Sequence, residues 1–190
     1  MLAQNNQSAP SDHAKSAPPL IRVIDDETAI QELFERIGKL CGFEVDCYGT
    51  ASSFLSSYSD ERPGCLVIDL MLPDRSGIEV LQEVTALGGE LPVVFMSGMA
   101  RVSEAVQALK LGSIDFLEKP FDVQQIAEVL RRAVNIDKKR RQEDCDQLDL
   151  RKRFESLTRR ENQVMEQIVR GAANKEVAAS LGLSHKTVEV

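Results

Sequence analysis

The 190-residue sequence predicts an α/β fold: a flavodoxin-like, doubly wound (βα)5 domain, followed by a helical linker and part of an all-α helix-turn-helix module. Three observations lead to this prediction. Short apolar runs alternate with stretches in which apolar residues recur three and four positions apart, as expected for a parallel sheet covered by helices on both faces. The alternation is confined to residues 20–137. Polar residues follow several of the apolar runs, and ligands bind at the carboxyl ends of such strands.

The five strands are predicted from short runs. Four runs are apolar along almost their whole length, which is typical of strands buried on both faces. The second run alternates between polar and apolar residues, which is also typical of a strand. In chain order the predicted strands are Leu20–Ile24, Glu44–Tyr48, Cys65–Asp69, Pro92–Met96 and Ile114–Leu117.

The five helices are predicted from apolar residues at helical spacing between and after the strands. Gly42 and Gly112 stand where the first and fourth helices should end. A loop before the third helix is marked by Pro73, Ser76 and Gly77. The helices are expected over residues 30–41, 50–57, 80–84, 102–111 and 126–134.

The segments outside this domain differ in composition. The N-terminal residues are rich in Ser, Asn, Gln, Ala and Pro, which predicts disorder. The polar stretch after the domain is either a solvated helical linker or, through Leu150, Phe154 and Leu157, a short self-pairing seam. We expect a disordered arm over residues 1–19, the α/β domain over 20–136, the linker over 137–156 and an incomplete helix-turn-helix module over 157–190.

Charge and cysteine usage restrict the functional class. Residues 20–137 contain 20 acidic and 10 basic side chains, whereas residues 138–190 contain 9 acidic and 12 basic ones. The acidic part suits a divalent cation, and the mildly basic part is compatible with DNA. No apolar run is long enough to span a membrane, and the N-terminus lacks the features of a secretory signal. The four cysteines form no CxxC pair, which argues against zinc and favours a cytoplasmic protein.

Polar side chains gather at the carboxyl ends of the predicted strands. Asp25 and Asp26 follow the first strand, Asp69 ends the third, Ser97 follows the fourth and Lys119 follows the fifth. Because these ends share one edge of a parallel sheet, we expect one pocket. Three carboxylates in one pocket need a cation, and oxygen ligands alone favour Mg²⁺. A carboxylate beside a metal, a lysine and a hydroxyl suits phosphoryl transfer.

Each of these residues has a simpler explanation when taken alone. Asp26 with Glu27 could be an acidic helix start, Ser97 a turn residue and Lys119 a surface lysine. The joint arrangement favours the pocket.

Four segments resemble the receiver domain of two-component response regulators, in the right order and spacing. They read IDDE at 24–27, VIDLMLPDRSG at 67–77, FMSG at 95–98 and FLEKPF at 116–121. The resemblance implies that Asp69 accepts the phosphoryl group. It also implies Mg²⁺ binding by Asp25, Asp26, Asp69 and the backbone carbonyl of Met71, contact with the phosphoryl oxygens by Ser97 and Lys119, an aromatic switch at Phe116, and a cis peptide bond between Lys119 and Pro120.

Two methionines occupy corresponding positions beside the predicted acceptor. Met71 and Met99 lie two residues beyond Asp69 and Ser97. We expect them to shield an acyl phosphate from water.

The C-terminal segment predicts a helix-turn-helix. Thr158 and Glu161 fit a capping box at the start of one helix, and a second helix begins near Asn174. Gly182, Leu183 and Ser184 form the turn after it, and Ser184 can cap a third helix. Ala178 and Gly182 suit a close crossing between helices.

The same segment resembles the LuxR-type DNA-binding module of FixJ/NarL-like regulators, through LTRRE at 157–161, NKEVAASLGLS at 174–184 and KTVEV at 186–190. By that resemblance the third helix enters the major groove. Lys175 and Lys186 are then expected at phosphates, and Thr187 and Glu189 near bases or backbone. Because the sequence ends inside the expected recognition helix, we expect this chain to bind DNA poorly by itself.

The overall prediction is a two-component response regulator. A sensor histidine kinase phosphorylates Asp69, the protein pairs as a homodimer, and the C-terminal module regulates transcription at promoter DNA, with no membrane partner. No enzymatic turnover is expected beyond autophosphorylation from small donors and autodephosphorylation.

Two alternatives stay open. The first is a Mg²⁺-dependent phosphohydrolase that forms an aspartyl-phosphate, although such enzymes usually have a second acid at the position of Met71. The second is a phosphorelay receiver without DNA output, against which the motifs of residues 157–190 argue.

Overall fold

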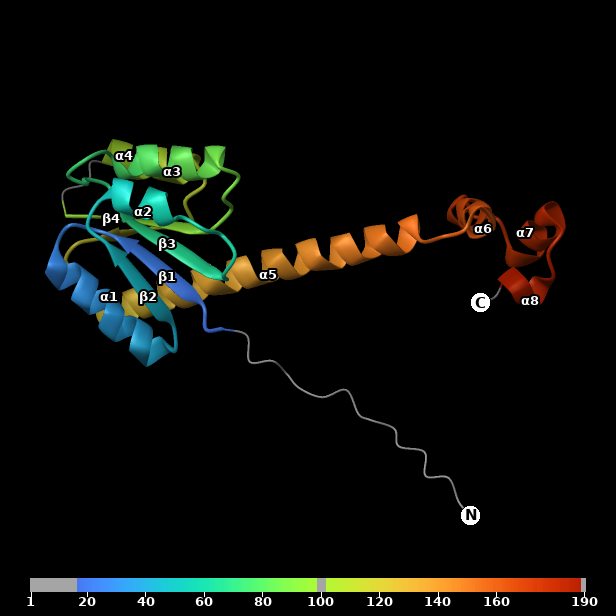
Figure 1. The fold of residues 1–190 in the computed structure, drawn as a ribbon, viewed down its shortest axis with the longest axis horizontal. Coiled ribbons are helices and arrows are strands. Elements are labelled where there is room, and N and C mark those ends of the chain that lie inside the picture. The colour runs from blue at the N-terminus through green and yellow to red at the C-terminus, as the bar shows by residue number, and fades with distance from the viewer. Residues whose placement is uncertain (1–16, 99–101, 189–190) are drawn as a thin grey trace, which may run out of the picture. The chain divides into compact units, whose positions relative to one another are not determined.

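The part of the chain up to Arg141 folds around a parallel five-stranded sheet (Figure 1). A computed structural model describes residues 17–98 and 102–188, and of residues 102–105 the backbone alone. The strand order β2-β1-β3-β4-β5, with all neighbours parallel, confirms the predicted flavodoxin-like fold. The strands are β1 Leu20–Ile24, β2 Glu44–Tyr48, β3 Gly64–Asp69, β4 Val93–Ser97 and β5 Asp115–Glu118.

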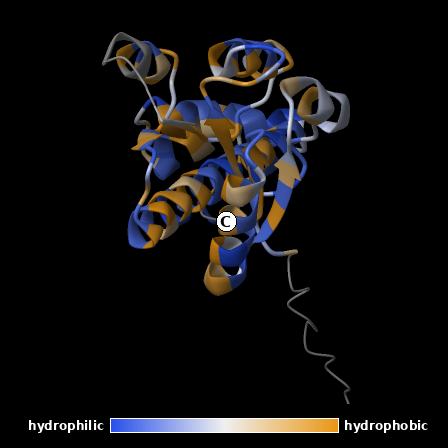
Figure 2. Ribbon diagram, turned by 90° about the vertical axis from the view of Figure 1, so that its left-hand side faces the viewer, coloured by the Kyte–Doolittle hydropathy of each residue, from blue (hydrophilic) through white to orange (hydrophobic). Residues whose placement is uncertain are grey.

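Helices cover both faces of this sheet. The residues of β1, β3 and β4 are buried throughout, because helical layers exclude water from both of their faces. Figure 2 shows the corresponding hydrophobic colour in the central strands. The helices of this unit are α1 Thr28–Cys41, α2 Ala51–Ser57, α3 Gly77–Ala86, α4 Val102–Lys110 and α5 Val123–Glu155.

Each face of the sheet has its own hydrophobic core. Phe34 of α1 and Leu130 of α5 pack on one face with residues of β1, β3, β4 and β5. Phe54 of α2, Val80 of α3 and Ala108 of α4 pack on the other face. Burial of these apolar side chains is the main stabilising contribution to the fold.

The observed helix ends follow from capping residues. The hydroxyl of Thr50 accepts a hydrogen bond from the Ser53 amide and begins α2. Ser76 and Glu79 form a capping box at the start of α3. Gly42 ends α1 in the left-handed conformation, as predicted.

The largest difference from the predicted elements is the length of α5. The sequence predicts a helix over residues 126–134 and a separate helical linker, but α5 runs unbroken for 33 residues from Val123 to Glu155. The chain divides into two compact units between Arg141 and Gln142, within α5.

A buried carboxylate explains why the contacts of the first unit extend past residue 136. Asp137 is fully buried and accepts a hydrogen bond of 2.9 Å from the amide of Gly64, the first residue of β3. It also pairs with Arg140 at 2.8 Å and with Arg141 at 2.7 Å. Arg140 pairs in turn with Glu90 and Arg141 with Asp60. This network fastens the middle of α5 to the loops that precede β3 and β4.

The predicted N-terminal arm falls largely outside the described residues. Of its last residues, Pro18 and Pro19 are hydrogen-bonded to the first unit. The carbonyl of Pro18 accepts from Arg62, and that of Pro19 accepts from the amide of Glu44.

The second unit contains three short helices around a small core. They are α6 Arg159–Val169, α7 Asn174–Leu181 and α8 His185–Val188. Val177, Ala178 and Val188 form the buried core. The capping box of Thr158 and Glu161 and the cap by Ser184 are as predicted.

The predicted turn at Gly182 is confirmed, but a close helix crossing at this residue is not. A Cβ at this position would meet nothing within 4 Å among the described residues, so no close contact there requires a glycine. Glycine is favoured there because the residue ends α7 with a φ of 64°, in the left-handed region. Within the described part of the chain, none of the helices combines the length and apolarity needed to cross a membrane.

We expect Asp137→Ala to lower the free energy of unfolding of the first unit by about 3 kcal/mol, because it leaves a buried amide and two arginines without their shared carboxylate. Urea denaturation followed by tyrosine fluorescence measures this loss, since both tyrosines, Tyr48 and Tyr58, lie in the first unit. Asp144→Ala, at an exposed position of α5, is the matched control. Equal denaturation midpoints for the two variants would contradict the role of Asp137.

Candidate functional site

The parallel sheet brings the predicted polar residues to one edge. β1 and β3 are neighbours, and the residue after β1 is Asp25, while β3 ends in Asp69. β4 ends in Ser97, and Lys119 directly follows β5. The amide of Lys119 donates to the carbonyl of Ser97 at 2.8 Å, which joins the ends of these two strands.

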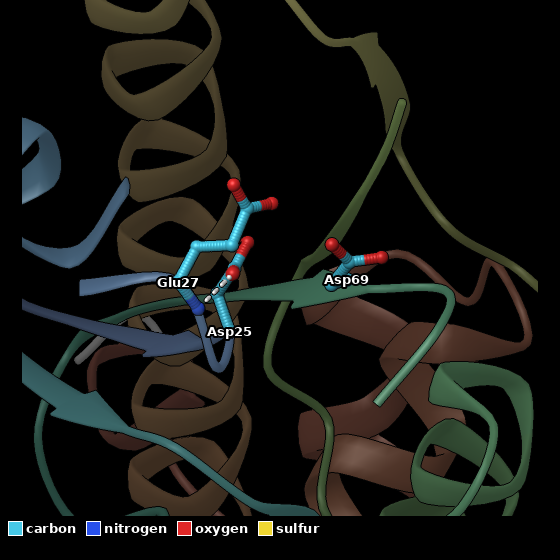
Figure 3. Close-up of side chains that lie close together, drawn as sticks. All are labelled: Asp25, Glu27 and Asp69. Carbon is cyan, nitrogen blue, oxygen red and sulfur yellow. Dashed lines mark hydrogen bonds between the residues drawn. The ribbon is translucent and has the colours of Figure 1, made fainter. Parts of the chain in front are cut away.

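Lys119 is the centre of the site. Its ammonium donates to Asp25 at 2.7 Å, to Asp69 at 2.6 Å and to Glu27 at 2.7 Å. Carboxylate oxygens of these three acids lie within 4.8 Å of one another (Figure 3). The side chain of Asp25 is 0% exposed and that of Asp69 is 9% exposed, whereas that of Glu27 is 59% exposed. Three negative charges therefore face one positive charge at the edge of a buried sheet.

The pKa values reflect this imbalance. Burial raises the pKa of the Asp25 carboxyl above its usual value, and hydrogen bonds from Lys119 and the Glu27 amide offset part of that rise. Burial alone would lower the pKa of Lys119, but hydrogen bonds to its carboxylate partners outweigh burial and leave that pKa above its usual value. The two directions are compatible, because Lys119 has three anionic partners and Asp25 shares one cation with two other acids.

Backbone amides orient two of the carboxylates. The amide of Glu27 donates to Asp25 at 2.8 Å, and the amide of Met71 donates to Asp69 at 2.9 Å. In both cases the donor lies two residues after the acid, so the chain turns back just beyond the strand. The side chain of Met71 is 73% exposed.

The loop that follows Asp69 is fixed at its other end by Asp74. This carboxylate accepts hydrogen bonds from the amides of Ala51 and Ser52, at 3.1 and 2.9 Å, and thereby caps α2. The hydroxyl of Ser52 donates a third bond at 2.7 Å. These hydrogen bonds lower the pKa of Asp74 to about 2. The β3–α3 loop is thus held on both sides of Met71.

The structure groups some of the predicted site residues and not others. It places Asp25, Asp69 and Lys119 together, and Ser97 lies buried at the same edge. Asp26 is exposed and lies outside the group of acids around Lys119. Its assignment as a metal ligand stays a prediction.

Sequence reasoning treated Glu27 as part of a helix start and missed its contact with Lys119. The residue type alone gave no signal, because its N-cap position at α1, where glutamate is not among the favoured residues, is established only by the structure. A glutamate at a cap position has a side chain long enough to serve another partner.

The other receiver predictions have mixed outcomes. The peptide bond between Lys119 and Pro120 is cis, as predicted. Phe116 is half-buried in β5 and packs against the core that contains α2, α3 and α4. Met99 lies outside the described residues.

The candidate DNA contacts lie in the second unit. Lys175 at the start of α7, and Lys186 and Thr187 in α8, are exposed. The hydroxyl of Thr187 lies 2.7 Å from that of Ser184, at the start of α8. Glu189 lies outside the described residues.

This unit also contains an open pocket of about 570 Å³. Its chemical character differs from that of the cluster of Asp25, Glu27 and Asp69. Its lining is mainly apolar and includes Leu150, Phe154, Leu157, Val164, Ile168 and Leu183. Such a lining offers no set of catalytic or metal-binding groups, so the chemistry is expected at the sheet edge.

Both units match known protein families. The profile of the response regulator receiver domain matches residues 21–131, and that of the bacterial regulatory proteins of the luxR family matches residues 155–190.

Similar proteins match most of the chain. The response regulator protein TodT of Pseudomonas putida is 33% identical over 94% of this chain and 78% of its own length. The transcriptional regulatory protein FixJ of Azorhizobium caulinodans is 38% identical over 90% of this chain and 81% of its own. Among solved structures, the response regulator StyR has a TM-score of 0.78 and 36% identity over 91% of this chain and 87% of its own. Full-length FixJ from B. japonicum has a TM-score of 0.62 and 33% identity over 92% and 86% of the two chains.

We expect Asp25→Asn to stabilise the protein in the presence of a chelator at neutral pH. The pKa of Asp25 is raised in the folded state, so the unfolded chain releases this proton first as the pH rises, and wild-type stability falls above the unfolded pKa of about 4. The variant lacks this loss. A gain of about 1 kcal/mol would raise the melting temperature by roughly 3 °C at pH 7 and vanish below about pH 4.

Thermal denaturation between pH 3.5 and 8 tests this expectation. Asp26→Asn removes the same charge from the neighbouring exposed position and should leave the melting temperature unchanged. Destabilisation of Asp25→Asn at neutral pH would show that its pairing with Lys119 outweighs the effect of burial.

Proposed function

This chain belongs to the response regulators that control transcription through a receiver domain and a LuxR-type DNA-binding domain, and on that premise we propose that a phosphoryl group on Asp69 is its switch. The observation that supports this most strongly is the position of Asp69. It ends the buried strand β3, its side chain is 9% exposed, and its carboxylate lies beside Lys119 and Asp25. An acid in such a place is accessible to a donor yet surrounded by groups that can bind a phosphoryl group.

The transfer we propose starts from a phosphohistidine of a sensor histidine kinase. A carboxylate oxygen of Asp69 attacks phosphorus, an O–P bond forms, and the N–P bond breaks with its electron pair left on the histidine nitrogen. Lys119 and the hydroxyl of Ser97 then contact the phosphoryl oxygens. The amide of Met71 holds Asp69 in place for the attack.

The residues present fit Mg²⁺. Three carboxylates against one ammonium leave a negative excess, and the oxygen-only donor set suits a hard cation. We propose that Asp25, Asp26, Asp69 and the backbone carbonyl of Met71 hold the ion. When bound, Mg²⁺ neutralises the negative charge that develops on the phosphoryl oxygens.

The readout we propose uses the face beside Ser97. Movement of Ser97 toward the phosphoryl group leaves space for Phe116, and this changes the surface of α4 and β5. We propose that the phosphorylated protein then pairs as a homodimer through α4 and α5. Such a switch needs two states that differ by a few kcal/mol and that a local charge can bias.

The output we propose is promoter binding in the cytoplasm by the module of residues 157–190. Lys175 and Lys186 are suited to phosphates, and Thr187 and Glu189 to bases or backbone. The α/β domain then acts on this module through α5, which continues past Arg141 into the second unit. The luxR-family match over residues 155–190 disfavours a phosphorelay receiver without DNA output.

We expect acetyl phosphate or phosphoramidate with Mg²⁺ to add one phosphoryl group per chain, and Asp69→Asn to remove the labelling. Intact-protein mass spectrometry measures the stoichiometry, and size-exclusion chromatography of the same samples reports pairing. A chelator should also prevent labelling. Continued consumption of the donor with multiple turnovers would instead favour the phosphohydrolase alternative.

A second prediction concerns the lifetime of the acyl phosphate. We expect Met71→Asn to accelerate dephosphorylation by up to about tenfold, or about 1.4 kcal/mol of activation free energy, because an amide admits and orients water where a thioether excludes it. The decay of the phosphorylated mass after removal of the donor gives the rate.

Met71→Leu, which keeps an apolar side chain of similar size, is the matched control and should retain the slow decay. Met99→Asn is expected to act in the same direction as Met71→Asn. Unchanged rates in both asparagine variants would refute the shielding role.

A further inference from the structure

All three hydrogen-bond donors of Lys119 are in use. A lysine ammonium has three N–H groups and no acceptor. In this structure Asp25, Glu27 and Asp69 accept from it at 2.7, 2.7 and 2.6 Å. A phosphoryl oxygen that contacts Lys119 must therefore replace one of these three acceptors.

Burial indicates which acceptor leaves. Asp25 and Asp69 have side chains that are 0% and 9% exposed, so water cannot readily replace Lys119 at either carboxylate. Asp69 is moreover the acid that receives the phosphoryl group. The side chain of Glu27 is 59% exposed, and water can solvate its carboxylate as soon as it departs. Glu27 is the acceptor that is released at the lowest cost in free energy.

Among the described residues, the side chain of Glu27 has no capping partner that would explain its position. It is the N-cap residue of α1, with φ −81° and ψ 108°, but among the described residues its side chain makes no capping hydrogen bond. Ser, Thr, Asp or Asn would cap the helix there. The contribution of Glu27 to the site is made by its backbone amide, which holds Asp25, and by its side-chain contact with Lys119.

From these observations, and on the basis of the proposed function, we infer that Glu27 is a positioning residue that occupies the third donor of Lys119 until a phosphoryl oxygen takes its place. Glu27 thereby competes with phosphorylation and sets how readily the unphosphorylated site accepts a donor. It acts through Lys119 and does not contact the reacting atoms.

The rate of labelling by acetyl phosphate at saturating Mg²⁺ tests this inference in the full chain. We expect Glu27→Gln to be labelled about threefold faster than wild type at low ionic strength, the factor typical of an exposed ion pair. The ratio should fall toward one as salt is added, because salt screens the wild-type contact. Glu118→Gln is the matched control, since it removes the same charge from an exposed residue adjacent to Lys119 in the chain and should keep the wild-type rate.

Two measurements separate this role from a structural one. Beryllofluoride, a stable phosphoryl analogue, should bind Glu27→Gln about threefold more tightly by calorimetry, the same factor as for the labelling rate. Glu27→Ser should gain a helix cap and a higher melting temperature while still being labelled faster than wild type.

Equal labelling of wild type and Glu27→Gln, or equal acceleration in Glu118→Gln, would overturn the inference. So would slower labelling of a stable Glu27→Ser. A wild-type chain that is not labelled on Asp69 at all would instead overturn the proposed function, so the two failures are distinguishable.

Discussion

The structure depends on one electrostatic constraint: three carboxylates share a single ammonium at the edge of a buried sheet. Asp25 and Asp69 cannot move apart, because each is fixed at the end of a strand that is packed on both faces. The hydrophobic cores on both faces of the sheet therefore stabilise a folded state in which these two carboxylates repel each other. A site of this kind favours the binding of a cation, and of a group that is itself bound by that cation.

The strand that contains Asp69 is held at both ends by charged networks. At its first residue, the amide of Gly64 donates to Asp137 of α5, and at its last residue Asp69 pairs with Lys119. The six residues of β3 therefore run from the contact with α5 at Gly64 to the candidate acceptor Asp69. This arrangement gives a short physical connection between the two ends of the sheet, through one rigid element.

The sequence was sufficient for the parts of the fold that depend on patterns. Four apolar runs and one alternating run located all five strands, and helical spacing located the helices between them. The rule that carboxyl ends of parallel strands share an edge located Asp25, Asp69 and Lys119. Reasoning from residue type could not find Glu27 or Asp137, because their roles depend on partners 92 and 73 positions away in the chain. An acid in a polar helical stretch looks solvated, so Asp137 was placed in the linker. Gly182 is a different case, because its role is local: its backbone conformation rather than its small size is what the turn requires.

The continuous α5 imposes a geometric condition on the side chains of its own C-terminal part. An α-helix advances by roughly 100° per residue, so the direction in which its last turn faces is fixed by the number of residues counted from the Asp137 anchor. One inserted residue would turn the remaining residues of α5 by roughly 100° about the helix axis, more than a quarter circle, whereas seven would nearly restore their directions. The number of residues in α5 beyond Asp137 therefore determines which of its later side chains share a face with the anchored ones.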